Sequence, residues 1–346
     1  MKRIMLSHGG GGLQSQELIN GLIIKHFSNP ILNNLEDAAV INTPSLLAFT
    51  TDSFTVSPIF FNGGDIGKLS IAGTVNDLSM MGARPLFLSV SFIIEEGFLI
   101  SDLEQIIISM KQEIDVTGAQ IVTGDTKVVP KGAVDKIFIN TSGIGQIVYQ
   151  GISSKNLSEG DVIIVSGTIG DHGACILAQR EGITLQTSLR SDCQSLWQLV
   201  NSLIESGIKI VAMRDPTRGG LAAVLNEWAS ASNIEIEITE SAIPIKPEVF
   251  GICEMLGMEA VTFACEGRMV IAVNKNDAQR ALETLRSHPL GRDASIIGVV
   301  KTIKNVGAGL VPALLQGYPY QVILKSDYGT SRIMELPSGE LLPRIC

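Results

Sequence analysis

Aspartates recur beside apolar stretches in the first half of the sequence, where carboxylates could hold a metal ion. Asp52 in "TTDSF" and Asp125 in "VTGDT" follow apolar runs, so we expect both at the C-terminal ends of strands, where α/β sheets gather ligands. Asp37 precedes the apolar "AAVI", and Asp77 lies beside Asn76 within an apolar helical pattern. Converging carboxylates bind Mg²⁺, which tends to share its ligands with nucleotide phosphates. Taken singly, Asp37 and Asp52 are better explained as caps of helices or turns.

Three glycine-rich stretches are candidates for binding an anion. "SHGGGG", residues 7–12, precedes an apolar helical pattern, so its free N–H groups could face a phosphate. "SGTIGDHGA", residues 166–174, and "RDPTRGGL", residues 214–221, each lie between a predicted strand and a predicted helix, and the latter contains Asp215 and Arg218. None matches the P-loop or a clean dinucleotide fingerprint. Alone, each stretch is more typical of a turn than of a phosphate site.

The sequence ends in "LPRIC", so its last residue, Cys346, carries a thiol. Four further cysteines are far apart and include no Cys-x-x-Cys motif: Cys175, Cys193, Cys253 and Cys265. An odd, scattered set favours free thiols in a reducing cytoplasm over disulfides or a structural zinc site. The four internal cysteines are most simply small apolar residues.

The segment before Cys346 has the composition of a movable arm. Extended chain from Glu335 onward could reach roughly 35–40 Å, at ~3.3–3.6 Å per residue. Pro337 and Pro343 would stiffen this arm, so the thiol could enter a site as a substrate does and then withdraw. Arg344 could anchor the arm and offset the unfavourable field of the chain end on thiolate formation.

Composition excludes several classes of protein. A chain of 346 residues is longer than one core usually supports, so two domains are expected. The net charge is −9 and no run of Lys or Arg occurs, which argues against a nucleic-acid or membrane-surface partner. No apolar stretch approaches a membrane span, and the start is not a secretory signal, so we expect a cytoplasmic protein.

Two blocks of alternating strand and helix patterns predict an α/β protein. In the first block we expect a helix over 66–81 and another over 101–118. The second would open with Ser101 and Glu104 as a capping box and stop at Gly118. A polar connection near residue 152 divides the blocks. The predicted parts are a first domain (1–152), a second domain (153–334) and a flexible tail (335–346).

The motifs occur in an order that resembles one known family: "HGGGG", "EDAAVI", "TTDSF", "GTVNDLSMMGARP", "VTGDTKVV", "SGTIGDHGA", "RDPTRGGL" and "LPRIC". This order is similar, over essentially the whole chain, to the HypE carbamoyl dehydratases of hydrogenase maturation. That family is part of the aminoimidazole-ribonucleotide-synthetase-like, or PurM-like, superfamily. Selenophosphate synthetase and thiamine-monophosphate kinase share the aspartate pattern, so the closing Pro-Arg-Ile-Cys and "GDTKVV" distinguish this family.

The resemblance implies a two-domain PurM-like fold. Its N-terminal ATP-binding domain would pair with its copy as a homodimer with a shared β-barrel, and a second α/β domain would cover the nucleotide. A HypF-type carbamoyltransferase would place a carbamoyl group on Cys346. The chain would then use ATP and Mg²⁺ to dehydrate the thiocarboxamide to a thiocyanate, and an iron-bearing scaffold of the HypC-HypD type would accept the cyanide. Phosphorylation of the carbamoyl oxygen makes phosphate the leaving group.

The resemblance also implies roles for individual residues. The Mg²⁺ ligands would be Asp37, Asp52, Asp77 and Asp125. The nucleotide contacts would be His8, Gly9, Gly10, Gly11, Gly12, Asn76, Gly124, Thr126, Asp215 and Arg218. The catalytic set would be Cys346, Lys127, Glu266 and Arg344. Glu266 is the candidate base, although the sequence alone explains it about equally well as an exposed carboxylate before a strand. Lys127 would orient or polarise the thiocarboxamide oxygen. His26 and His172 receive no role.

Two rival hypotheses stay open. The chain could be a small-molecule kinase or a selenophosphate synthetase of the same superfamily, but the latter needs a reactive residue near the N-terminus and none of the first 174 residues is Cys. It could instead be a non-enzymatic adaptor for metal-centre assembly that uses Cys346 as a ligand or docking handle. An adaptor leaves the aspartate pattern unexplained.

Overall fold

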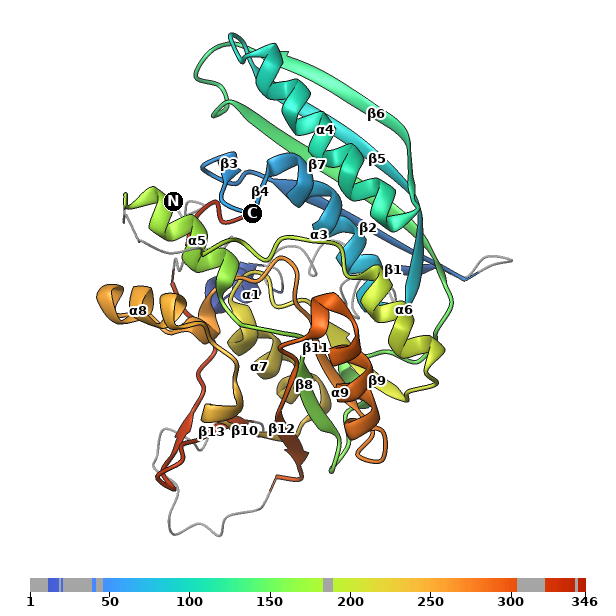
Figure 1. Ribbon diagram of the computed structural model, residues 1–346, viewed down its shortest axis with the longest axis vertical. Coiled ribbons are helices and arrows are strands. Elements are labelled where there is room, and N and C mark those ends of the chain that lie inside the picture. The colour runs from blue at the N-terminus through green and yellow to red at the C-terminus, as the bar shows by residue number, and fades with distance from the viewer. Residues whose placement is uncertain are drawn as a thin grey trace.

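The computed structural model describes residues 12–18, 20, 39–41, 46–182, 189–303, 321–339 and 342–346. These residues form a five-stranded sheet and a seven-stranded sheet, each with helices packed against it (Figure 1), so the predicted α/β class is confirmed. A small third sheet pairs β3 (Phe60–Phe61) with β4 (Gly64–Asp65). No helix among the described residues is long and apolar enough to cross a membrane.

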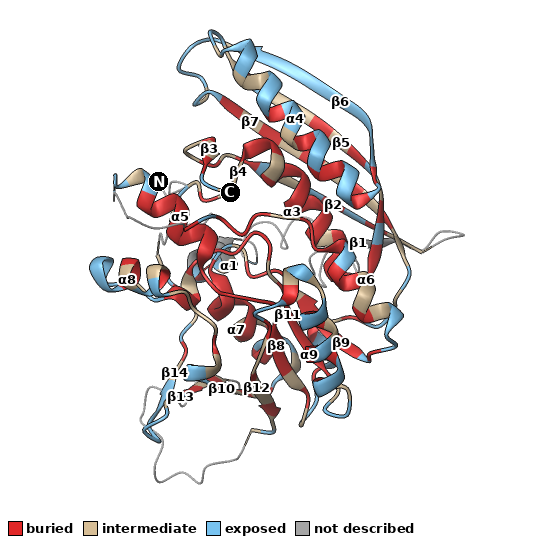
Figure 2. Ribbon diagram, in the orientation of Figure 1, coloured by how far each residue is buried: buried red, intermediate tan, exposed pale blue. Residues whose placement is uncertain are grey.

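The five-stranded sheet is built from the first half of the chain. Its strands lie in the order β1 (Ala39–Ile41), β2 (Leu47–Phe54), β7 (Ile137–Ile147), β5 (Ala83–Glu95) and β6 (Gln120–Val129). Only β5 and β6 pair in parallel. Two helices, α3 (Ile66–Met80) and α4 (Ile100–Thr117), cover one face. The edge strand β6 is almost entirely exposed (Figure 2).

Helix α3 confirms the helix predicted from 66 to 81. Asp65 is its N-cap, and the carboxylate oxygen Oδ1 accepts hydrogen bonds from the main-chain nitrogens of Gly67 at 2.8 Å and Lys68 at 2.9 Å. Its side chains are mostly apolar or small, and the helix is buried on nearly every side. A helix buried in this way fixes the position of any polar side chain that it carries, because such a side chain must find a partner inside the protein.

Helix α4 ends as predicted but begins differently. Gly118 adopts the left-handed conformation (φ 74°) that terminates many helices. The predicted capping box is wrong: the N-cap is Leu99, so Ser101 already lies in the first turn and makes no cap hydrogen bond. Asp102 supplies the acidic side chain of that turn instead, where it favours the positive end of the helix dipole.

The seven-stranded sheet is built from the second half of the chain. Its order is β14 (Ser331–Ile333), β13 (Gln321–Lys325), β10 (Glu235–Thr239), β12 (Ser295–Lys301), β8 (Val162–Val165), β11 (Val270–Val273) and β9 (Ile210–Arg214). The helices of this half are α5 (Asp171–Arg180), α6 (Trp197–Glu205), α7 (Gly220–Ser232), α8 (Pro247–Leu256) and α9 (Ala278–Ser287). Short 3₁₀ turns lie at Ser154–Asn156, Glu240–Ala242, Ala260–Thr262 and Pro289–Gly291.

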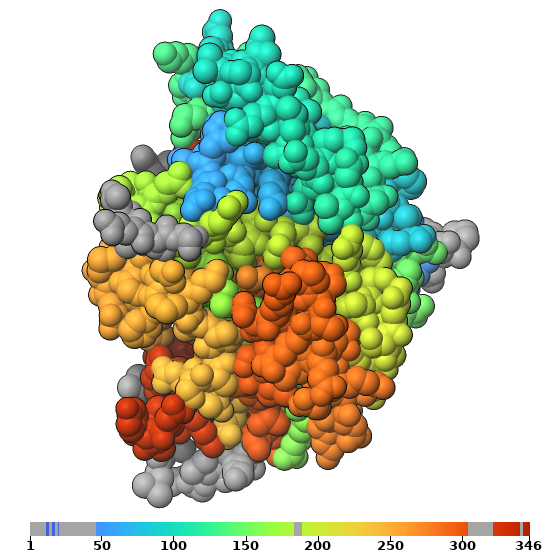
Figure 3. All heavy atoms as spheres, in the orientation of Figure 1, coloured from blue at the N-terminus to red at the C-terminus, as the bar shows by residue number. Residues whose placement is uncertain are grey.

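Side chains alternate across this sheet between two apolar cores. On β11, Val270 and Ala272 pack with α7, whereas Ile271 and Val273 pack with α6 and α9. The second of these cores also contains the apolar residues of α3, so the two halves of the chain share one continuous core. Figure 3 shows the blue and teal atoms of the first half resting on the yellow-green segment that leads into α6. A short helix, α1 (Leu13–Leu18), starts beside the tail, where Leu13 donates to the carbonyl of Pro337.

Asp65→Ala tests the capping of α3. We expect the free energy of unfolding to fall by about 1–2 kcal/mol, because two buried main-chain N–H groups lose their acceptor. Urea unfolding followed by circular dichroism measures this loss. Asp102→Ala in the first turn of α4 is the control, with an expected change within about 0.5 kcal/mol. Equal losses for the two variants would contradict the capping role.

Candidate functional site

The last residues of the chain lie against the segment that follows strand β2. The main-chain oxygen of Cys346 accepts hydrogen bonds from the nitrogen of Thr55 at 2.9 Å and from its hydroxyl at 3.2 Å. The nitrogen of Ser57 donates to the carbonyl of Arg344 at 3.2 Å. Figure 1 places this end of the chain between β3, β4 and α5. The tail is therefore docked between the two halves.

His172, at the start of α5, holds the next carbonyl of the tail. Its Nε2 atom lies 2.7 Å from the carbonyl oxygen of Ile345, and its Nδ1 atom lies 2.7 Å from the hydroxyl of Ser191. A carbonyl only accepts hydrogen bonds, so Nε2 carries the proton and Nδ1 accepts from Ser191. The imidazole is fully buried, and burial lowers its pKa. A neutral ring in this tautomer therefore fixes the tail.

Arg180, at the end of the same helix, contacts three further main-chain oxygens. Its guanidinium nitrogens donate to the carbonyls of Ser57, Pro343 and Arg344. The planar, five-donor guanidinium suits several acceptors at once. Arg180 thus ties the strand segment and the tail together.

Arg344 is held by the first sheet. Its guanidinium donates to the carboxylate of Asp135 at 2.6 Å and to the carbonyl of Thr55 at 2.8 Å, and it stacks 5.6 Å from the centre of the Phe138 ring. The hydrogen bond from Arg344 lowers the pKa of Asp135. Arg344 also adopts a positive φ of 52°, which turns the chain so that Ile345 is buried.

The docked tail places the Cys346 thiol among charged groups. The residue packs against the core shared by the two halves. Burial raises the pKa of the thiol, and the carboxylate of Glu266 raises it further. Arg218 acts in the opposite direction, whereas Asp52 and Asp215 add to the increase. The thiolate is the reactive form of cysteine, so the docked thiol is protonated and a poor nucleophile.

Glu266 is buried, with 2% of its surface exposed. The alternative of an exposed carboxylate before a strand is therefore wrong. Burial raises its pKa well above the ordinary range of a glutamate, and the charges of Asp215 and Asp192 contribute further. Its Oε1 atom has no hydrogen-bond partner among the described residues. A buried oxygen with no partner is costly to keep, and it is available to a substrate group.

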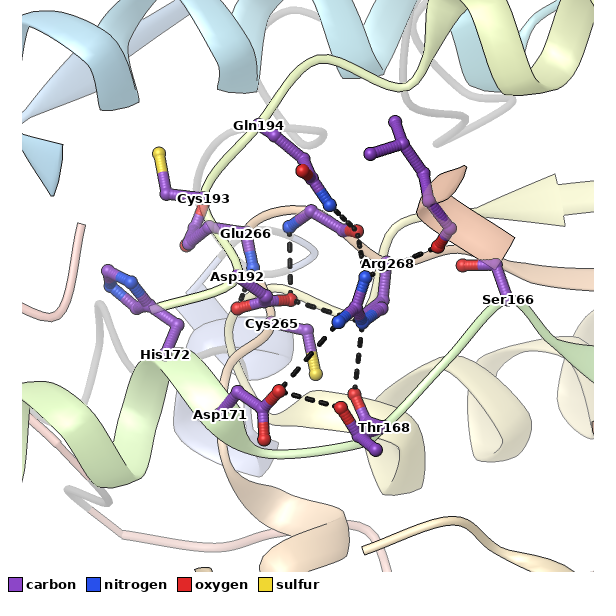
Figure 4. Close-up of polar contacts among 12 residues, drawn as sticks. Ser166, Thr168, Asp171, His172, Asp192, Cys193, Gln194, Cys265, Glu266 and Arg268 are labelled. Carbon is purple, nitrogen blue, oxygen red and sulfur yellow. Dashed lines mark hydrogen bonds and ion pairs between the residues drawn. The ribbon is translucent and has the colours of Figure 1, made fainter. Parts of the chain in front are cut away.

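The main chain around Glu266 is held from both halves of the protein. Figure 4 shows the contacts made by Asp192, from the second half. The carboxylate of Asp192 accepts from the main-chain nitrogens of Glu266 at 3.3 Å and Gly267 at 3.2 Å. From α3, the amide nitrogen of Asn76 donates to the carbonyl of Glu266 at 3.3 Å, and its oxygen accepts from the nitrogen of Leu196 at 2.8 Å. Asn76, expected among the nucleotide contacts, is thus engaged with the protein main chain and positions Glu266.

Asp52 and Asp77 face each other between β2 and α3. The hydroxyl of Thr50, two residues before Asp52, donates to Asp77 at 2.7 Å. Asp52 also lies close to α3, since a Cβ on Gly73, one turn before Asp77, would lie 4.0 Å from the Oδ2 atom of Asp52. Burial raises the pKa of Asp52. Both charges interact with Arg218, so the two acids and the arginine belong to the site that contains Cys346.

Asp215 joins the same group of residues. It is buried at 5% exposure, and burial raises its pKa to about 6. The nearby charge of Asp52 contributes to this increase. Of the residues expected in the site, the structure therefore brings together Cys346, Glu266, Asp52, Asp77, Asp215 and Arg218.

Asp125 and Lys127, on β6, lie apart from this group of residues. Residues paired side by side form rows across the strands of the first sheet. Asp125 is in the row of Ser91, whereas Asp52 is in the neighbouring row, with Thr141 and Val90. Neighbouring rows point to opposite faces, so Asp125 lies on the face opposite Asp52. The expectation that both acids end their strands is also wrong, since each lies within its strand. A single chain does not bring Asp125 to the other acids.

Lys127 shares that exposed face. Its Nζ atom lies 3.5 Å from the carboxylate of Asp125. Through the register it aligns with Ile93 and then with Phe138, so it stands two strand spacings, about 10 Å, from the ring that Arg344 covers. Within the chain, Lys127 is therefore separated from the tail.

Three other residues that were expected to contact the nucleotide instead contact neighbouring parts of the protein. A Cβ on Gly124 would lie 2.3 Å from the carbonyl oxygen of Val90, so close pairing of β5 and β6 requires glycine. Thr126 is exposed, and its nitrogen donates to Asp125 at 2.8 Å. Gly12 packs against the carbonyl of Pro337 at the start of the tail. The remaining expected residues lie outside the described part of the chain: His8, Gly9, Gly10, Gly11 and Asp37.

Comparison with known proteins gives the family. Residues 35–147 match the model of the AIR synthase related protein N-terminal domain, and residues 158–309 match that of the C-terminal domain. Carbamoyl dehydratase HypE of Escherichia coli K12 is 47% identical over 100% of both chains, and that of Rhodobacter capsulatus is 42% identical over 100% of this chain and 98% of its own. The chain belongs to the HypE family of carbamoyl dehydratases.

Solved structures of the HypE family agree with the fold. A crystal structure of a HypE–HypF complex superposes with a TM-score of 0.84 at 45% identity, covering 92% of this chain and 99% of that one. HypE in complex with ATP gives a TM-score of 0.81 at 43% identity over 99% of this chain and 100% of that chain. A thiamine monophosphate kinase from Aquifex aeolicus shares the fold at 20% identity, with a TM-score of 0.66. The two-sheet fold is therefore shared with a protein of much lower sequence identity.

Sequence reasoning missed the residues that dock the tail: Thr55, Asp135, His172, Arg180 and Ser191. Most of them bind main-chain oxygens, which every residue has, so their partners leave no trace in the sequence. One signal was present. His172 lies in "SGTIGDHGA", a polar ring in the first turn of a helix that continues with the small and apolar run of residues 173–178.

Arg180→Ala tests the docking of the tail. Hydrogen bonds from a charged donor contribute about 1.5–3 kcal/mol each, so losing them should raise the rate of Cys346 alkylation by iodoacetamide at least about tenfold. Mass spectrometry of the C-terminal peptide measures that rate. Arg280→Ala on α9, which removes a surface arginine bonded to Asp277, is the matched control. An unchanged rate in Arg180→Ala would contradict the docking role.

Proposed function

We propose that this chain uses ATP to dehydrate a carbamoyl group carried on the sulfur of Cys346, giving a thiocyanate. The observation that carries the proposal is the placement of the thiol beside Glu266, with Asp52 and Arg218 close enough to interact with its charge. Relatives named carbamoyl dehydratase HypE cover the whole chain, and one HypE structure contains ATP. The names of relatives also refer to the formation or maturation of hydrogenases.

The chemistry requires the carbamoyl oxygen to leave. Transfer of the γ-phosphoryl group of ATP to this oxygen forms a C–O–P bridge and releases ADP. Breaking the C–O bond then expels phosphate, while the two N–H protons leave and the C–N bond becomes a triple bond. One thiocarboxamide and one ATP therefore give one thiocyanate, ADP and phosphate. The protein must position the oxygen and accept protons.

Glu266 is the proposed base. Its carboxyl is buried, its charge acts on the Cys346 thiol, its Oε1 atom has no partner in the described structure, and its pKa is raised by burial. A raised pKa makes the carboxylate a stronger base than an exposed glutamate. Asp192 and Asn76 hold its main chain, so its carboxyl is aimed by residues that take no part in the chemistry.

Asp52 and Asp77 are proposed to hold Mg²⁺. They are the two acids that face one another inside the site, and hard oxygen donors of this kind suit the ion. When bound, the ion would neutralise phosphate charge. No group of three or more metal-binding side chains occurs in the part of the chain that is described. Asp37 and the Asp125 of a second protomer are the proposed further ligands, while Asp215 and Arg218 face the nucleotide.

Loading of Cys346 is proposed to occur outside the site. The docked thiol is protonated, whereas carbamoylation needs the thiolate. A carbamoylated sulfur does not ionise, so burying it costs no free energy for removing a charge from water. A HypF-type carbamoyltransferase would therefore modify the withdrawn tail, in line with the HypE–HypF complex known for relatives. A HypC-HypD type scaffold would accept the cyanide. Five free cysteines accord with the cytoplasm.

A homodimer would complete the site. The outer face of the first sheet and the edge strand β6 expose large apolar side chains: Phe49, Phe87, Ile93, Ile121, Val122 and Val128. An open edge and an apolar face of this kind favour pairing with another copy. Pairing of two such sheets into a β-barrel would place Asp125 and Lys127 of one protomer at the tail of the other.

Removal of one acid tests the phosphoryl-transfer step. Carbamoylated protein incubated with Mg²⁺ and ATP should lose the mass of one water, and omission of Mg²⁺ or ATP should prevent the loss. Asp77→Asn should slow it at least about a hundredfold, since the carboxylate contributes through charge. Intact-mass spectrometry measures the change, with Asp102→Asn on the surface of α4 as the control. Water loss without ATP would contradict the proposal.

Mixing two inactive variants tests the shared site. Asp125→Asn should not dehydrate its own tail as a homodimer, and Cys346→Ser has no tail thiol. In a 1:1 mixture about half of the Asp125→Asn chains pair with Cys346→Ser, which supplies an intact Asp125, so about half of their tails should lose water. No gain on mixing, with exchange shown by native mass spectrometry, would place Asp125 outside the partner's site.

A further inference from the structure

The groove that holds the tail recognises main chain. Each carbonyl oxygen of residues 343–346 accepts at least one hydrogen bond from outside the tail. The donors are Arg180 for the first two oxygens, His172 for the third and Thr55 for the last, and Ser57 adds a second bond to the Arg344 oxygen. All four acceptors are main-chain oxygens, and the tail turns at Arg344 (φ 52°), so the tail is bound through its main chain in a turned conformation.

Side-chain contacts add selectivity to this main-chain pairing. Ile345 is 5% exposed and belongs to the core that joins the two halves. Arg344 pairs with Asp135 and stacks on Phe138. Leu342 packs against the same core. The groove therefore accepts a basic residue next to Asp135 and then an apolar residue in the core, which is the order of Arg344 and Ile345 in the tail.

None of these contacts depends on the covalent link between the tail and the second sheet. The hydrogen bonds, the ion pair and the ring contact join residues 343–346 to Thr55, Ser57, Asp135, Phe138, His172 and Arg180, and Leu342 and Ile345 add packing against the core. A segment of the same sequence on another molecule could make every one of them. The tether contributes only proximity, equivalent to an effective concentration on the order of 1 mM.

We propose that this groove is a peptide-binding site that accepts the tail of a second copy of the chain in trans when its own tail is withdrawn. In the intact chain, the tethered tail outcompetes a second tail when the concentration of the second tail is below the effective concentration of the tethered one. A copy whose tail is occupied elsewhere leaves its groove open. The proposal concerns binding alone, so it stands or falls independently of the proposed dehydration.

The test measures binding of a synthetic peptide of residues 339–346, with serine replacing the oxidisable cysteine and fluorescein at its N-terminus. Fluorescence anisotropy is followed with the chain lacking residues 343–346, with the full chain, and with the full-length variant Arg344→Glu, whose tail Asp135 repels. The shortened chain should bind with a Kd between about 10 and 100 μM, below the effective concentration of the tethered tail. Full-length Arg344→Glu should bind in the same range, and the unaltered chain at least about tenfold more weakly.

Two matched changes locate the binding. In the shortened chain, Arg180→Ala should weaken binding at least about fivefold, whereas Arg280→Ala on α9 should leave it unchanged. A peptide carrying Arg344→Glu should also bind at least about fivefold more weakly, because it meets Asp135. The proposal is overturned if neither the shortened chain nor full-length Arg344→Glu binds the peptide saturably. Equal affinity for the unaltered chain, or no effect of Arg180→Ala, would also overturn it. The full-length variant decides the matter if the shortened chain does not fold.

Discussion

The hydrogen bonds from Thr55, His172 and Arg180 to the main-chain oxygens of the tail are the constraint on which the site depends. They bring Cys346 from the end of the sequence to a point between two sheets that are far apart along the chain. His172 is buried and neutral, so its two ring nitrogens have fixed roles: one donates to Ile345 and the other accepts from Ser191. Without these bonds the thiol has no fixed position relative to Glu266.

Burial of the thiol accords with the proposed role of Cys346 as a carrier. Docked beside Glu266 and removed from water, the thiol stays protonated and is protected from side reactions. In the proposed cycle, the tail withdrawn into water would regain the ordinary reactivity of a thiol and receive a carbamoyl group. The modified sulfur would be uncharged and would return without an electrostatic penalty. The same desolvation raises the pKa of Glu266, so one buried environment serves both the carrier and the proposed base.

The sequence predicted the elements that local patterns control and missed what tertiary pairing controls. Helix α3 followed from its apolar run, and the end of α4 followed from Gly118. The structure brings Asp52 and Asp77, both expected in the site, together near Arg218, and Glu266 proved buried. The face of Asp125 could not be predicted, because a register shift between Leu88 and Ser89 sets which side chains of β6 point outward. The docking of the tail could not be predicted either, since the hydrogen-bond acceptors of the tail are main-chain oxygens, which every residue has.

The docked tail keeps the Cys346 thiol protonated, and titration of this thiol tests its protonation state directly. With ¹³C at the Cβ atom of Cys346, the chemical shift reports ionisation of this one thiol. We predict no titration step up to about pH 10 in the unaltered protein, against an ordinary cysteine pKa of about 8.5. A step should appear near that ordinary value when Arg344→Glu releases the tail. A full step near pH 8.5 in the unaltered protein would contradict the account.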